Sequence, residues 1–193
     1  MRLVINVLLV VAIGLSLGAT SALYSIKRNN ALGGIQAGAW TAWPFAGGAA
    51  ADPYTMAKVS RDGTIPLGAT EGLAFEAATD DLEEPLDLNC DYTISGITPP
   101  SKLWTLAVYD MQGIPIKPST GGKSAIHSGK LLRFPDGSFR ITVGRRPAPG
   151  NWLSVTGDSN FYFVLRVYDT PVTSTTGAVT PQMPNILKQG CAS

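Results

Sequence analysis

One stretch of the chain, KPSTGGKSAIHSGK at 117–130, holds the residue types that bind phosphates. It contains a glycine pair, Lys123 beside a serine, and His127, the sole histidine. A phosphate-binding loop needs G-x-x-x-x-G-K-[ST] between a strand and a helix, because glycine backbone wraps the phosphates and the helix N-terminus faces them. Lys117 stands where the first glycine belongs, and a glycine and a proline soon interrupt any helix. We therefore predict a glycine-rich connection that binds no nucleotide and no other cofactor.

The histidine raises the prospect of acid–base or nucleophilic catalysis. A histidine base needs a nucleophile and an orienting carboxylate within reach. Ser124, Ser128 and Asp110 are available, but no spacing groups them with His127, and there is no G-x-S-x-G motif. We predict no catalytic residue here and keep Lys123 and His127 as candidates for binding.

Carboxylates and an arginine at strand ends offer a different chemistry. Asp110 and Asp169 each follow a tyrosine at the end of a predicted strand. If both ends met at one rim, the pair would suit glycoside hydrolysis, which needs two carboxyls roughly 5 to 10 Å apart. Arg166 lies in FVLRVYD between apolar neighbours. It either joins Tyr162 and Tyr168 on a solvent-facing row or pairs, partly buried, with a carboxylate such as Asp110.

An acidic cluster, DDLEE at 80–84, supplies oxygen ligands of the kind that calcium takes. It lacks the D-x-D-x-D-G spacing of a calcium loop. We therefore predict a solvated turn and no metal site.

Aromatic residues near these groups would stack on sugar rings if they were exposed together. The set comprises Trp104, Trp152, Tyr162 and Tyr168. Aromatic residues of central strands usually pack in the core, so a complete platform is not expected. The binding candidates are accordingly Arg166, Asp110, Tyr168, Trp152, His127 and Lys123.

Hydrophobic alternation predicts the strands that position these residues. Segments 73–77, 88–95 and 138–143 alternate apolar and polar residues, as half-buried strands do. The acidic segment between the first two is predicted to be a hairpin connection. Segments 103–110 and 161–169 carry bulky residues on both faces, as central strands do. Short strands separated by turns predict an all-β fold, a β-sandwich of jelly-roll type.

The N-terminal segment predicts a membrane helix. From Leu3 to Ile26 there are 24 residues without a charge, about 36 Å of helix, enough to span a hydrocarbon core of roughly 30 Å. Small residues around Ala19 leave a cleaved signal peptide as the alternative. Apolar residues continue beyond them, which favours a transmembrane anchor over residues 1–28.

The remainder divides into two parts. Residues 29–51 are rich in glycine and alanine and are predicted to be a linker, which leaves 52–193 as the β-sandwich domain. Asp52 followed by Pro53 predicts a short helix up to about Arg61, because aspartate caps a helix and proline suits its first position.

The two cysteines, Cys90 and Cys191, are about 100 residues apart and lack the C-x-x-C spacing of a zinc site. A disulfide formed after export to an oxidising compartment is the favoured interpretation. Two buried free thiols in a reducing cytoplasm are the alternative.

The order of motifs resembles a known family. LWTLAVYD, PDGSFRITV, NWL and FYFVLRVYDTP follow one another as in the domain of unknown function 1214 family, over roughly residues 54–186. The resemblance implies a jelly-roll β-sandwich and implies no activity. Ser154 follows NWL where the family usually has proline. The connection at 117–130 carries Ser119, Lys123 and His127 where members usually have an asparagine and an arginine.

These features predict a bacterial inner-membrane protein with a single N-terminal span and its sandwich in the periplasm. Lys plus Arg (15) nearly equals Asp plus Glu (14), so the charge favours no nucleic-acid partner. The expected partners are the membrane and an envelope protein or glycan. We expect a non-enzymatic binding or scaffold module. The alternative is a hydrolase or lyase that acts on an envelope carbohydrate or small molecule through Asp110, Asp169, Arg166 or His127.

Overall fold

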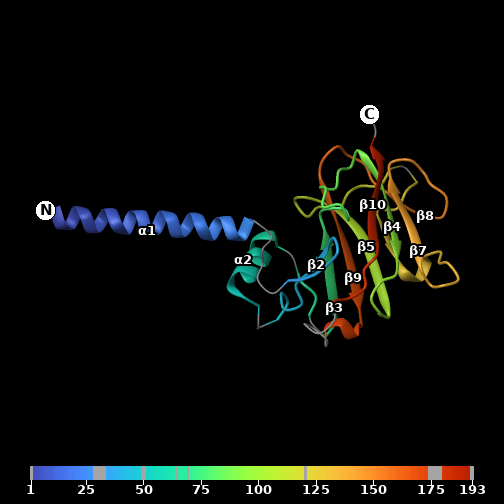
Figure 1. Ribbon diagram of the computed structural model, residues 1–193, viewed down its shortest axis with the longest axis horizontal. Helices are drawn as coiled ribbons and strands as arrows, with labels where there is room; N and C mark the ends of the chain where they lie inside the picture. Colours follow the sequence, from blue (N-terminus) through green and yellow to red (C-terminus); the bar gives the residue numbers. More distant parts are fainter. Residues whose placement is uncertain are drawn as a thin grey trace.

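The computed structural model shows a long N-terminal helix that projects from a two-layer β-sandwich (Figure 1). It describes residues 2–27, 34–48, 51–63, 65–68, 70–119, 121–173 and 180–191.

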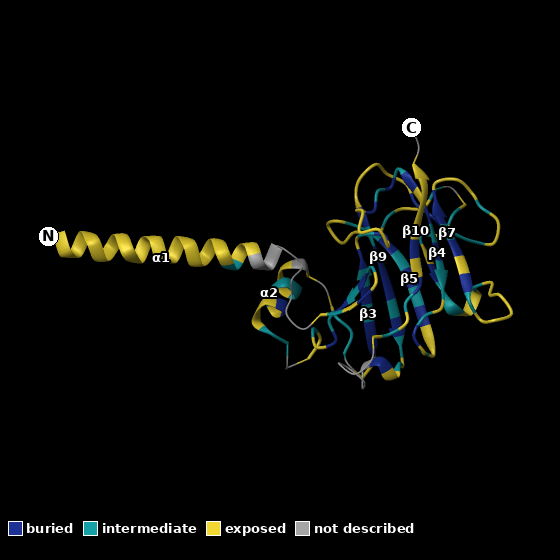
Figure 2. Cartoon of the chain, viewed as in Figure 1, coloured by how far each residue is buried: buried dark blue, intermediate teal, exposed yellow. Residues whose placement is uncertain are grey.

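Helix α1 (Arg2–Lys27) is long and apolar enough to cross a membrane over Arg2–Tyr24. None of that stretch is buried inside the protein, and Figure 2 shows the helix exposed along its length. Its apolar side chains are therefore left on the surface of the described chain. This is the arrangement that a membrane anchor requires, and the apolar core of a signal sequence has the same character.

One layer of the sandwich is a six-stranded antiparallel sheet in the order β1-β2-β3-β9-β5-β6. Its strands are β1 (Ile35–Ala37), β2 (Trp40–Ala42), β3 (Gly72–Ala77), β9 (Phe161–Tyr168), β5 (Leu103–Asp110) and β6 (Ala125–His127). The two segments with bulky residues on both faces, β5 and β9, are inner strands of this sheet, as predicted.

The second layer is a four-stranded sheet in the order β10-β4-β7-β8. Its strands are β10 (Asn185–Cys191), β4 (Cys90–Gly96), β7 (Phe139–Gly144) and β8 (Asn151–Ser154). β7 and β8 run parallel, whereas the other neighbours are antiparallel. The mostly-β, two-sheet fold is thus confirmed. The jelly-roll type is not confirmed, and the two sheets do not close on each other.

The core lies between the sheets, where alternate residues of each strand point inward. Phe75, Leu165 and Leu106 come from the six-stranded sheet, and Tyr92 and Ile141 face them from the other; all are at most 1% exposed. Burying each such side chain stabilises the fold by about 1.5 to 3 kcal/mol. The polar alternate rows are thereby left on the outer faces.

The predicted hairpin between the segments 73–77 and 88–95 is wrong. β3 and β4 belong to different sheets, so the acidic segment between them crosses from one layer to the other. The alternation of apolar and polar residues indicates that one face of a strand is buried. It does not show whether the next strand along the chain lies in the same sheet or in the facing sheet.

The expected linker 29–51 contributes two strands in its described part. Trp40 of β2 is 1% exposed, and its indole Nε1 donates to the Pro184 carbonyl oxygen at 2.7 Å. The short helix is confirmed as α2 (Pro53–Asp62): the Asp52 side chain accepts from the backbone of Tyr54 and Thr55, and Gly63 ends the helix at φ 62°.

Candidate functional site

The strand register gathers polar and aromatic side chains on the outer face of the six-stranded sheet. Arg166 of β9 pairs with Ala74 of β3 and with Thr105 of β5, and Thr105 pairs with His127 of β6. Residues directly opposite in register share a face, and neighbouring strands are about 4.8 Å apart. Arg166 and His127 therefore lie on one face, about 10 Å apart between backbones.

The centre of this face is a cluster of two tyrosines and one arginine. Tyr109 of β5 pairs directly with Tyr162 of β9, and their rings stack with centroids 5.8 Å apart and planes 21° apart. Arg166 Nη1 donates to the Tyr109 hydroxyl at 3.1 Å, and its guanidinium carbon lies 5.5 Å from the Tyr109 ring centre. Arg166 thus lies in the outer row of β9 with Tyr162 and is half-buried there. We call these three residues the tyrosine–arginine cluster.

Burial makes Tyr162 a hydrogen-bonding group and not a base. Desolvation, with Glu76 and Tyr109 adding negative potential, raises the pKa of Tyr162 to about 12. Its hydroxyl therefore keeps its proton throughout the physiological range and can donate as well as accept a hydrogen bond.

A groove of about 1210 Å³ lies over this cluster. Its floor is the outer sheet face, including Tyr109, Tyr162 and Arg166, and one wall comes from α2 and the turns beside it, including Trp43 and Val59. Val164, on the same face as Arg166, is 3% exposed although it points away from the core. The groove thus combines aromatic and aliphatic surface with a few polar groups, the usual composition of a ligand site.

Asp110 and Asp169, which the sequence could not place relative to each other, lie at opposite rims. β5 and β9 are antiparallel, so Asp110 pairs with Phe161, whereas Asp169 follows Tyr168 at the other end. An eight-residue strand separates them by about 25 Å, too far for glycoside hydrolysis. Asp110 instead accepts from the backbone of Gln112 and Ile114, which holds the turn after β5.

The four aromatic residues do not form one platform. Trp104 is buried in the core. Trp152 lies on β8 of the four-stranded sheet, where its Nε1 donates to the Gly144 carbonyl oxygen at 3.1 Å. Tyr162 and Tyr168 share the outer face of β9 and lie near its two ends, six residues apart. Trp152 is therefore remote from the tyrosine–arginine cluster, and Tyr168 lies on the same face.

Ser154, which stands where the family usually has proline, holds the glycine-rich connection by hydrogen bonds. The Ser154 hydroxyl accepts from the Ser119 backbone N–H at 2.9 Å and contacts the Ser119 hydroxyl at 2.6 Å. The Ser154 N–H donates to the Lys123 carbonyl oxygen at 2.8 Å, and Ser154 is fully buried. These bonds occupy the backbone of the connection, while the Lys123 side chain is exposed.

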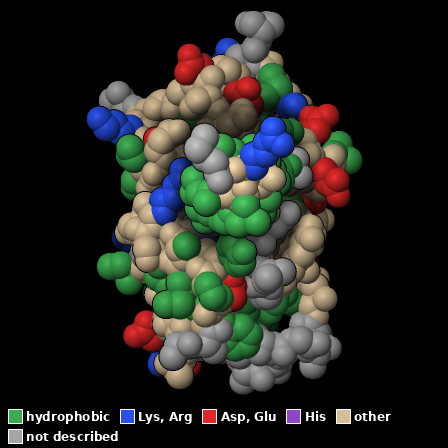
Figure 3. All heavy atoms as spheres, turned by 90° about the vertical axis from the view of Figure 1, so that its left-hand side faces the viewer, with side chains coloured by type: hydrophobic (Ala, Val, Ile, Leu, Met, Phe, Trp, Pro, Cys, Tyr) green, Lys and Arg blue, Asp and Glu red, His purple; other side chains and the backbone are tan. Residues whose placement is uncertain are grey.

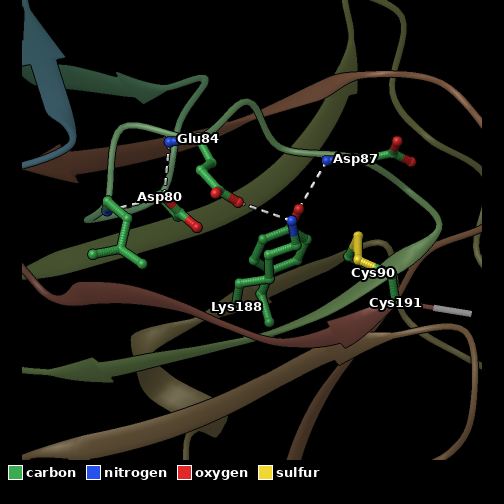
Figure 4. Close-up of polar contacts among 8 residues, drawn as sticks. Asp80, Glu84, Asp87, Cys90, Lys188 and Cys191 are labelled. Atoms are coloured by element: carbon green, nitrogen blue, oxygen red, sulfur yellow. Dashed lines mark hydrogen bonds and ion pairs between the residues drawn. A yellow bond between two sulfur atoms is a disulfide. The ribbon is translucent and has the colours of Figure 1, made fainter.

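The acidic cluster forms a turn, as predicted, but it is not solvated throughout, because Asp80 is buried at 2% exposed. The Asp80 side chain accepts from the backbone of Leu82 and Glu84 at 2.9 and 3.0 Å. Glu84 pairs with Lys188 of β10 at 3.0 Å (Figure 4). Among the described residues, no group of three His, Cys, Asp or Glu side chains is placed to hold a metal ion.

The predicted disulfide joins Cys90 to Cys191. These residues pair in register on β4 and β10, so the bond links two neighbouring strands (Figure 4). It closes a loop with a sequence separation of 101 residues.

Most residues of the groove were not candidates from the sequence, and Tyr109 and Trp43 are the main examples. Tyr109 precedes the candidate Asp110, and its position opposite Tyr162 depends on a register that single-strand patterns do not reveal. Trp43 lies in the expected linker and lines the groove because β1 and β2 join the sheet. Its aromatic character inside a segment of small residues was the available signal.

Comparison with known proteins identifies relatives without an assigned activity. The family described as protein of unknown function (DUF1214) matches residues 71–172, from β3 to the turn after β9, which confirms the resemblance in the sequence. No curated protein matches the chain.

Two solved structures are similar. The VPA0106 protein from Vibrio parahaemolyticus has a TM-score of 0.58 and 20% identity, over 73% of this chain and 36% of that chain. An uncharacterized protein from Burkholderia cenocepacia has a TM-score of 0.43 and 17% identity, over 67% of this chain and 33% of that one. The first supports the fold, and the second score is too low to support an argument. The chain spans about a third of the length of both proteins.

Proposed function

This chain belongs to the DUF1214 family, whose function is unknown, and we propose that it is a membrane-anchored periplasmic module that binds an envelope glycan without chemically changing it. The groove over the outer face of the six-stranded sheet is the proposed binding site. The tyrosine–arginine cluster on its floor is the observation that carries the proposal.

The chemistry of the groove suits a sugar. A glycan presents C–H faces that pack on aromatic and aliphatic surface, together with hydroxyls that need donors and acceptors. Tyr109 and Tyr162 supply ring surface and hydroxyls, and Arg166 supplies N–H donors next to them. Glu76, which also lines the groove, supplies carboxylate acceptors. The site thus offers apolar contact and hydrogen bonds in both directions.

The same residues support binding over catalysis. Tyr162, with its raised pKa, supplies no base at neutral pH. Asp110 is engaged by the backbone of its own turn, and Asp169 lies at the opposite rim. A hydrolase would need a paired acid and base beside the ligand, and these candidates do not make one.

The compartment rests on two features together. α1 has the length and composition of a membrane anchor, and the Cys90–Cys191 disulfide belongs to an oxidising compartment. A sandwich exported behind an uncleaved N-terminal helix meets both conditions in the periplasm. There the groove has access to envelope glycans.

Calorimetry on the full chain in nanodiscs tests the proposal, with soluble peptidoglycan fragments and lipopolysaccharide core oligosaccharide as titrants. We expect one of these glycans to bind, and we expect Tyr162→Ala and Arg166→Gln each to weaken it at least about tenfold. Arg140→Gln is the matched control, because Arg140 is exposed on β7 of the other sheet. Absence of binding by both glycan classes, equal loss in Arg140→Gln, or cleavage of the glycan during incubation would each contradict the proposal.

A further inference from the structure

The chain between β2 and β3 lies between the end of α1 and the outer face of the six-stranded sheet (Figure 1). We call its described residues within 43–68, which include α2, the membrane-side segment. α1 and α2 contact each other. The apolar span of α1 runs to Tyr24, and the charged Lys27 ends the helix. If α1 crosses a bilayer, the surface of the hydrocarbon core lies at this end of α1, so α2 lies at the depth of the headgroups.

The membrane-side segment exposes large apolar side chains. Phe45 is 49% exposed, Tyr54 44%, Met56 55% and Ile65 96%. Figure 3 views the molecule along α1 and shows further hydrophobic side chains on the surface around that helix. Single exposed apolar residues are ordinary on a soluble surface. Here the exposed apolar side chains belong to a segment that α1 would hold at the lipid surface. Inserting aromatic and aliphatic side chains into the interfacial layer of a bilayer is energetically favourable.

The charges of this segment identify the kind of lipid contact. Lys58 and Arg61 are balanced in the sequence by Asp52 and Asp62, so the segment carries no net charge. An attraction to anionic headgroups needs an excess of basic residues. The contact suited to this segment is therefore apolar insertion, which needs neither anionic lipid nor low salt.

We propose that the membrane-side segment rests in the interfacial layer of the bilayer that α1 spans, with its exposed apolar side chains among phospholipid headgroups and upper acyl carbons. This rests on the anchoring role proposed for α1 and is independent of a glycan ligand. The outer face of the six-stranded sheet then faces the membrane. The groove, whose wall includes α2, then lies next to the bilayer surface.

Spin labelling of the full chain in phosphatidylcholine nanodiscs tests this contact. Single cysteines replace Met56, Ile65, Val11 and Leu132 in separate variants, and the native cysteines do not react because they form a disulfide. Collision of the label with oxygen and with a water-soluble nickel complex reports its depth. Leu132 is the matched control: it is 66% exposed, and its N–H donates to Asn151 of β8. β8 belongs to the four-stranded sheet, which lies on the side of the sandwich away from α1 (Figure 1).

We expect the Met56→Cys or Ile65→Cys label to collide with oxygen several-fold more than with nickel, relative to Leu132→Cys, at low and high salt alike. Water-like ratios at both positions, equal to the control, would overturn the inference while Val11→Cys still reports the bilayer interior. A water-like ratio at Val11→Cys would overturn the inference and the anchoring role of α1 together. The glycan titration is unaffected by either result.

Discussion

Tyr109 and Tyr162 face each other across β5 and β9 in direct register, and their rings stack 5.8 Å apart beneath the groove. Neither residue is close to the other in the sequence. The pair exists because the two inner strands run antiparallel, and it gives the outer face an aromatic centre that Arg166 covers from β9.

The half-buried Tyr162 makes the stability of the fold depend on alkaline pH. Its pKa is about 12 in the folded protein and close to 10 in an unfolded chain, so the folded state holds this proton more tightly. The stabilisation is fully present below pH 10 and is lost as the pH rises from 10 towards 12. We expect Tyr162→Phe to reduce this alkaline loss, measured as the urea midpoint between about pH 9 and pH 11.5. Tyr168→Phe, on the same strand and face, is the control, and an equal reduction there would contradict the assignment.

Trp40 ties the segment before α2 to the sandwich. Trp40→Phe removes the hydrogen bond to Pro184 and leaves a small cavity at a site that is 1% exposed. We expect the free energy of unfolding to fall by about 2 to 4 kcal/mol in urea denaturation. Trp152→Phe, at a half-buried site, should cost about 1 kcal/mol. If Trp40→Phe lowered the free energy of unfolding by less than Trp152→Phe does, β1 and β2 would not unfold together with the sandwich.

The disulfide should account for a measurable part of the stability. A double Cys90→Ser, Cys191→Ser variant opens a loop of 101 residues. We expect a loss of about 2 to 4 kcal/mol, within a chain-entropy limit of about 4.7 kcal/mol. Reductant should produce a similar loss in the natural chain and none in the variant. Reactive thiols in the native, unreduced protein would show that the bond does not form.

Ser154 should hold the glycine-rich connection in place. Ser154→Ala loses both contacts with Ser119, at an expected cost of about 1 to 3 kcal/mol because the site is fully buried. Ser154→Pro, which restores the usual family residue, also removes the N–H that donates to Lys123. We expect the natural chain to be the most stable, Ser154→Ala to be less stable and Ser154→Pro to be the least stable. Trypsin should cleave after Lys123 most slowly in the natural chain and fastest in Ser154→Pro. A proline variant as stable as the natural chain would refute the role of this serine.

Local patterns in the sequence predicted individual elements well. β5 has the predicted bounds, 103–110, because bulky residues on both faces mark an inner strand. The Asp52 cap and Pro53 start α2 as predicted, because both act within one helical turn. The disulfide between Cys90 and Cys191 could also be predicted, because the sequence contains only these two cysteines.

Features that depend on which strands pair, and in which register, could not be predicted from the sequence. Asp110 and Asp169 end similar strands, but only the antiparallel register shows that they lie at opposite rims. Tyr109 gained its importance from Tyr162, which is 53 positions away. β1 and β2 have three residues each, too few for alternation to reveal, so the groove wall that follows them was not predicted.

The hydrogen bond from Trp40 to Pro184 also limits the order in which parts of the chain can fold. The two residues are 144 positions apart, and an exported chain emerges from its N-terminal side first. The Trp40 indole can form this bond only after the segment that carries Pro184 has also been made. Folds built on such distant contacts form slowly and expose apolar surface meanwhile. If the sandwich is exported as proposed, the newly exported chain passes through a period in which its apolar surface is open to chaperones and proteases.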